Sequence, residues 1–135
     1  MADKLFEPFL THLEFLGYNI SKDKDDDKEY LAEHSSYGRN ILRPYLNGLL
    51  IQKYFITNKN AQKKRDDFLD SVNSLNNSAL IVNYVIVGDK DMALRVDGLY
   101  LGEYSKAKFS AFIEFFNTDV YERFMKNDAI IEFME

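Results

Sequence analysis

The chain has 135 residues, a net charge of −5 and an apolar fraction of 46%, which fits a single domain with a substantial core. No block is strongly basic and there is no cysteine. This composition argues against a nucleic-acid binder and excludes disulfides, thiolate catalysis and cysteine-bound zinc. The sequence lacks a signal-peptide pattern and any apolar run near the ~20 residues that cross a bilayer, so we expect a cytoplasmic protein that does not bind membranes.

Residues 3–17 carry apolar side chains at helical spacing and predict the first helix. Its expected apolar stripe consists of Leu5, Phe6, Phe9, Leu10, Leu13 and Leu16. Asp3 can cap the start of this helix, and Gly17 can end it. Pro8 falls near the first turn, where its missing N–H is least costly.

The next segment, residues 18–57, has the turn and β-rich composition of three or four strands. Asn47-Gly48 separates two apolar runs and predicts a two-residue hairpin turn with positive φ at both positions. Pro44 cannot donate a backbone hydrogen bond, so we place its strand at a sheet edge or a bulge.

Helical spacing returns over residues 58–78 and predicts a second helix. The residues expected to face inward are Ala61, Phe68, Leu69, Val72 and Leu75. Two strands should follow within residues 79–101, and in the second the side chains of Met92, Leu94 and Val96 should share one face.

Ser105 can cap a final helical region that continues to residue 135, with a break near Asn117 or Asn127. With three strands before residue 58, the predicted order is α-β-β-β-α-β-β-α. Tight turns between neighbouring strands favour a mainly antiparallel sheet, and the three helical regions place the chain in the α+β class as one domain over residues 1–135.

The acidic stretch SKDKDDDKEY raises the question of a calcium loop. With Asp23 as position 1 of an EF-hand loop, Asp25 and Asp27 fall at positions 3 and 5. Position 6 is Lys28 where glycine is needed, and position 12 is His34 where a bidentate glutamate is needed. We therefore expect a charged strand connection without tight calcium binding.

Residues that suggest catalysis or cofactor binding are few. The two histidines, His12 and His34, have no recognisable nucleophile motif beside them, and no glycine-rich phosphate loop is present. The acidic residues at 66–70 are explained by a solvated helix face. The four basic residues within 59–65 are expected to be ordinary surface residues without a binding role. We expect no enzymatic activity, no metal and no cofactor.

The carboxy-terminal region holds more apolar side chains than one helical stripe needs. The stripe itself consists of Phe109, Phe112, Ile113, Phe116, Val120 and Phe124. A thick core could absorb the remainder, or the remainder could form a surface for self-association or a partner. We predict that such a partner-binding surface contains Phe115, Tyr121, Met125, Ile131 and Met134.

The stretch FLDSVNSLNNSALIVNYVIVGDKDMALRVDGLY, residues 68–100, resembles the YbjN family, which is related in fold to the small acidic chaperones of type III secretion. The resemblance extends loosely over most of the chain, beginning with LEFLGY, and rests on the order of elements and on the helix that ends in VNSLNN. Asn73 and Asn76 match an Asn-x-x-Asn tendency at that helix end. The resemblance to the YbjN family implies three helices against an antiparallel sheet, frequent homodimers, no catalytic residues and binding of another protein.

These observations favour a non-catalytic interaction module that is chaperone-like or a regulatory adaptor, with another protein or a second copy as its partner. A small-ligand-binding domain or a small enzyme, with a site assembled from dispersed residues, remains the alternative. A pocket with converging polar groups would favour the alternative, and an apolar patch would favour the module.

Overall fold

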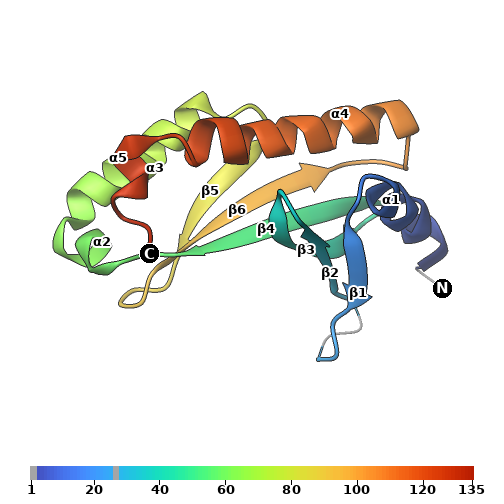
Figure 1. The fold of residues 1–135 in the computed structure, drawn as a ribbon, viewed down its shortest axis with the longest axis horizontal. Coiled ribbons are helices and arrows are strands. Elements are labelled where there is room, and N and C mark those ends of the chain that lie inside the picture. The colour runs from blue at the N-terminus through green and yellow to red at the C-terminus, as the bar shows by residue number, and fades with distance from the viewer. Residues whose placement is uncertain (1–2, 26–27) are drawn as a thin grey trace. The chain divides into compact units, whose positions relative to one another are not determined.

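The computed structural model describes residues 3–25 and 28–135, with the Asp3 side chain left aside. Figure 1 shows an α+β fold built on an open antiparallel sheet of six strands in the order β1-β2-β3-β4-β6-β5. The elements are α1 (Asp3–Phe15), β1 (Asn19–Lys22), β2 (Tyr30–His34), β3 (Gly38–Tyr45), β4 (Gly48–Ile56), α2 (Lys59–Lys63), α3 (Arg65–Ser78), β5 (Val82–Val87), β6 (Ala93–Tyr100), α4 (Lys106–Asn117), the π-helical segment η1 (Thr118–Phe124) and α5 (Asp128–Ile131).

The predicted fold class is confirmed, and the predicted order with three strands before the second helix is one strand short. The turn at residues 35–37 separates β2 from β3, with Gly38 in the left-handed region at φ 67°. The hairpins β1–β2 and β2–β3 are antiparallel, with Ile20 opposite Ala32 and Ala32 opposite Asn40.

The chain divides into two compact units, residues 1–52 with 98–114 and residues 53–97 with 115–135. The single domain expected over residues 1–135 stays a prediction. In the first unit, the core is an aromatic cluster with ring centres 5.0 to 5.6 Å apart in edge-to-face contacts. Its members are Phe9, Tyr100, Phe109 and Phe112.

Helix α1 packs against β1 and ends as predicted at Gly17, whose φ is 98°. The Gly17 N–H donates to the Glu14 carbonyl and the Tyr18 N–H donates to the Leu13 carbonyl, the paired bonds of a Schellman motif. The predicted stripe of α1 is only partly buried. Phe6, Phe9 and Leu13 lie in the core, whereas Leu5 and Leu16 are 61% and 40% exposed.

The hairpin β3–β4 exists, but its predicted turn is wrong by one residue. Tyr45 pairs with Gly48, so the turn is Leu46-Asn47, and Leu46 has the positive φ of 54°. Gly48 serves another purpose, because a Cβ built on it would lie 2.0 Å from the Tyr100 carbonyl oxygen.

Pro44 also departs from its predicted place, because β3 is an interior strand. The β2–β3 ladder reaches Tyr30 opposite Leu42, two residues before Pro44. The proline therefore lies beyond the residues that β2 pairs with, where its missing N–H removes no bond of that ladder.

In the second unit, α3 packs against β5, α2 and α5. The predicted second helix is interrupted at Lys64, and Leu69 is 38% exposed where burial was expected. Asn76 clamps α3 to β5: its amide donates to the Tyr84 carbonyl at 3.0 Å and its oxygen accepts the Tyr84 N–H at 2.7 Å. This contact gives the VNSLNN helix end a structural role.

One break was predicted in the carboxy-terminal region, near Asn117 or Asn127, and the helix changes at both places. Segment η1 starts after Asn117, and the Asn127 side chain caps α5 by accepting the Ile130 N–H. Asp119 of η1 is fully buried, and its carboxylate accepts the backbone N–H groups of Leu80, Ile81 and Val82 at 2.8 to 3.2 Å. The predicted stripe residues are all buried: Phe109, Phe112, Ile113, Phe116, Val120 and Phe124.

Candidate functional site

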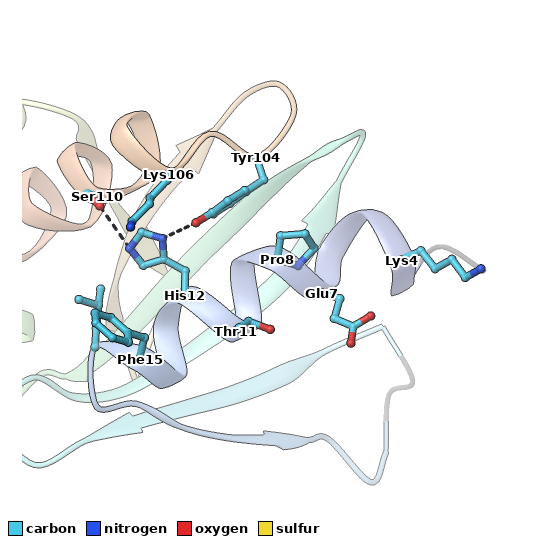
Figure 2. Close-up of a pocket in the computed structure, with 10 residues that line it drawn as sticks. Lys4, Glu7, Pro8, Thr11, His12, Phe15, Tyr104, Lys106 and Ser110 are labelled. Atoms are coloured by element: carbon cyan, nitrogen blue, oxygen red, sulfur yellow. Dashed lines mark hydrogen bonds between the residues drawn. The ribbon is translucent and has the colours of Figure 1, made fainter.

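An apolar groove of about 550 Å³ lies within the first unit, between α1 and the start of α4. We call it the α1–α4 groove. Figure 2 shows that its lining follows α1 almost from end to end, with Lys4 and Glu7 toward one end and Phe15 at the other. The lining residues are Lys4, Glu7, Pro8, Thr11, His12, Phe15, Leu16, Tyr104, Lys106 and Ser110.

His12 joins three segments of the first unit in the wall of this groove. Its Nδ1 lies 2.7 Å from the Tyr104 hydroxyl, and its Nε2 lies 3.3 Å from the Ser110 hydroxyl (Figure 2). The ring packs edge-on against Phe109 with centres 5.1 Å apart, and the residue is 8% exposed. Both ring nitrogens therefore have protein partners, and the imidazole ties α1 to α4.

The surroundings of His12 favour the uncharged form of its ring. Burial lowers the pKa of His12 below its usual 6.5, and the nearby Lys106 ammonium lowers it further. Figure 2 shows Lys106 reaching toward the His12 ring. The polar part of the groove is thus the hydrogen-bonded chain of Tyr104, His12 and Ser110, next to the Lys106 ammonium.

Phe15 is the most exposed of the large apolar side chains in the described part of the chain, at 87%. The expected stripe of α1 omits it, because its position falls off the helical spacing of the buried residues. The sequence did contain a signal for the exposure of Phe15. This aromatic residue lies outside the apolar stripe of a helix whose core face is already filled. Sequence reasoning also left His12 without partners, since Tyr104 and Ser110 lie 92 and 98 residues away.

The five residues predicted to bind a partner lie in the second unit. Phe115 and Met125 are 46% and 44% exposed, whereas Tyr121, Ile131 and Met134 are half-buried. The Lys53 ammonium lies 5.3 Å from the centre of the Tyr121 ring, and Met134 forms an isolated β-bridge with Thr57. Their role in partner binding stays a prediction.

The acidic stretch lies partly outside the described residues, because Asp26 and Asp27 are not described. Its expected lack of tight calcium binding therefore stays a prediction. Within residues 3–25 and 28–135, no cluster of three or more histidine and carboxylate side chains could hold a metal. His34 has a structural role: its Nε2 donates to the Leu16 carbonyl and its Nδ1 accepts the Ser36 N–H.

No helix in the described part of the chain is long and apolar enough to cross a membrane. No model of a known protein family matches the chain, and no curated protein sequence is significantly similar to it.

Among solved structures, the chain is similar to YbjN from E. coli, which is described as a candidate transcription regulator. The TM-score is 0.73 over 96% of this chain and 95% of the YbjN chain, at 12% sequence identity. The chain has a YbjN-like fold. The predicted resemblance, which was expected over most of the chain, is therefore confirmed at the level of the fold.

Proposed function

We propose that the chain is a non-catalytic protein-interaction module, chaperone-like or a regulatory adaptor, that binds a segment of a partner protein in the α1–α4 groove. The observation that carries this proposal is the apolar groove with the 87% exposed Phe15 at its end. Leaving a large apolar side chain in water forgoes roughly 1.5–3 kcal/mol of burial, which a bound segment would recover. The description of YbjN as a regulator agrees with such a role.

The length of the groove along α1 fits a protein segment. The lining runs from Lys4 to Phe15, and a rise of 1.5 Å per residue makes this stretch about 17 Å long. That length equals about three turns of a bound helix or five residues of an extended strand.

The Ser110–His12–Tyr104 chain is the observation that favours the alternative of a small enzyme, since it places a hydroxyl beside a general base. The charges oppose that alternative. A histidine that takes a proton from serine becomes an imidazolium, which a buried carboxylate normally stabilises. Here the Tyr104 hydroxyl takes the place of the carboxylate, and burial and the nearby Lys106 ammonium both lower the pKa of the histidine.

Peptide selection tests the proposed function. A displayed peptide library is selected on the wild-type chain, and the affinities of the selected peptides are measured for Phe15→Ser and Leu5→Ser. Leu5 is a matched control, because it is exposed on the same helix and does not line the groove. We expect Phe15→Ser to weaken binding by about 10-fold or more, the equivalent of one buried aromatic side chain, and Leu5→Ser to leave it unchanged.

Two results would argue against this function. Equal affinities for both variants would place the binding site outside the groove. Labelling of Ser110 by a fluorophosphonate, detected by mass spectrometry and lost in His12→Gln, would instead support a serine enzyme.

A further inference from the structure

The α1–α4 groove carries an unbalanced positive charge. Its lining contains two lysines and one glutamate, whereas the whole chain has a net charge of −5. In Figure 2, Glu7 lies toward the other end of the groove and points away from Lys106. The cationic part of the groove is therefore where α4 begins, beside His12.

Lys106 has no acidic partner in the described part of the chain. Ion pairs there occupy other lysines, such as Lys64 with Glu132 and Lys126 with Glu122, and none includes Lys106. The first turn of α4 contains no acidic residue either. A lysine at the amino-terminal end of a helix opposes the helix dipole, so the local field favours an incoming negative charge.

The hydroxyl groups next to Lys106 can also serve an anion. Ser110 is exposed on the same face of α4, four residues after Lys106, and its hydroxyl can turn from His12 toward a ligand oxygen. The His12 ring nitrogens already face the Tyr104 and Ser110 hydroxyl groups, so His12 positions Ser110 within the groove. The ammonium of Lys106 thus provides the charge, and Ser110 provides an adjustable donor.

Resting on the proposed function, we infer that the occupant of the α1–α4 groove is a partner-protein segment whose apolar side chains cover Phe15 and Leu16 and whose aspartate or glutamate pairs with Lys106. The groove's apolar lining and its length select the apolar part of the segment, and the unpaired cation selects the acidic residue. Electrostatic complementarity of this kind mainly sets which partner binds and how fast it binds.

A double-mutant cycle tests this pairing. The probe is a peptide from the library selection that contains an acidic residue, together with the same peptide carrying glutamine or asparagine at that position. Both peptides are measured against the wild-type chain, Lys106→Glu and the control Lys108→Glu. Lys108 is exposed on the same helix and does not line the groove.

We expect the acidic peptide to lose about 5-fold or more in affinity for Lys106→Glu, and the amide peptide to lose much less, so that the two changes are coupled. Lys108→Glu should affect both peptides equally. Coupling should disappear at 1 M salt, where charges are screened.

The outcomes separate the inference from the function on which it rests. Peptides that need Phe15 but show no preference for an acidic residue, and no coupling to Lys106, overturn the inference and leave the proposed function standing. Failure of Phe15→Ser to affect any selected peptide removes the proposed function itself. Wild-type self-association that Phe15→Asp abolishes would place a second copy in the groove and overturn the inference.

Discussion

At the scale of single residues, two buried charged side chains behave in opposite ways. Lys53 is 4% exposed, and burial lowers the pKa of its ammonium to about 8. Asp119 is fully buried but accepts three backbone N–H groups and lies 3.6 Å from the Arg123 guanidinium. The first charge should therefore oppose folding near neutral pH, and the second should support it.

We predict that Lys53→Met stabilises the chain at pH 7 by roughly 1–3 kcal/mol, because a charge that burial disfavours is removed. The loss of the contact between Lys53 and Tyr121 offsets part of this gain. Urea unfolding at pH 7 measures the difference. The exposed Lys90→Met is the control and should change stability little.

The effect of Lys53 should depend on pH. Below pH 8 the lysine is protonated in both the folded and the unfolded chain, so its full cost is present. Between about 8 and 10.5 the unfolded chain binds more protons, so this contribution to stability rises with pH. The gap between Lys53→Met and the wild type should therefore narrow from pH 8 to pH 10, and a constant gap would contradict the assignment.

We predict that Asp119→Ala destabilises the chain by about 2–4 kcal/mol, because it leaves the N–H groups of Leu80, Ile81 and Val82 without their acceptor. Asp70→Ala removes an exposed carboxylate from α3 and should stay within about 0.5 kcal/mol of the wild type. Thermal and urea unfolding of both variants give the comparison. Equal stability of the two variants would show that the hydrogen bonds from these three N–H groups to the Asp119 carboxylate do not stabilise the fold.

At the scale of elements, the β3–β4 hairpin has two unusual backbone features, a positive φ and a close backbone contact, and they occur at different residues. Leu46 has φ 54°, a region that costs a residue with a side chain about 1–2 kcal/mol. Gly48 has no such φ but lies against the Tyr100 backbone. The turn and the close approach of β4 to residue 100 can therefore be tested separately.

Changes at these two positions should have opposite signs. Leu46→Gly should stabilise the chain by about 0.5–1 kcal/mol, because glycine adopts positive φ without a steric penalty. Gly48→Ala should destabilise it by about 2 kcal/mol or more, because the new Cβ meets a backbone oxygen that cannot move alone. Urea midpoints measure both, with Asn47→Ala as the control within the same turn. Stabilisation by Gly48→Ala would refute the close approach.

At the scale of the whole molecule, the exposed carboxy-terminal apolar residues predict self-association. Phe115 and Met125 are nearly half exposed, so burying both against a second copy would be favourable. We predict that sedimentation velocity shows a concentration-dependent dimer of the wild type that is weakened in a Phe115→Ser, Met125→Ser double variant. Leu46→Ser, which removes an 85% exposed leucine elsewhere, is the control. A wild type that stays monomeric at high concentration would refute this surface.

The sequence alone determined what depends on neighbouring residues. The α+β class, the end of α1 at Gly17, a break of the last helical region near Asn117 or Asn127 and the buried face of β6 were all predictable. Each follows from local spacing or from a residue with special backbone preferences. The resemblance to YbjN followed for the same reason, because it rests on the order of such elements.

Only the tertiary structure decided which side chains lie outside the core and which meet. Leu5 and Phe15 look as apolar in the sequence as Phe9 does, but burial depends on which element covers each helix face. The α1–α4 groove joins His12 to hydroxyl groups more than ninety residues away, and Gly48 is required by the carbonyl of Tyr100. No local pattern encodes these contacts, because they depend on the path of the chain through space.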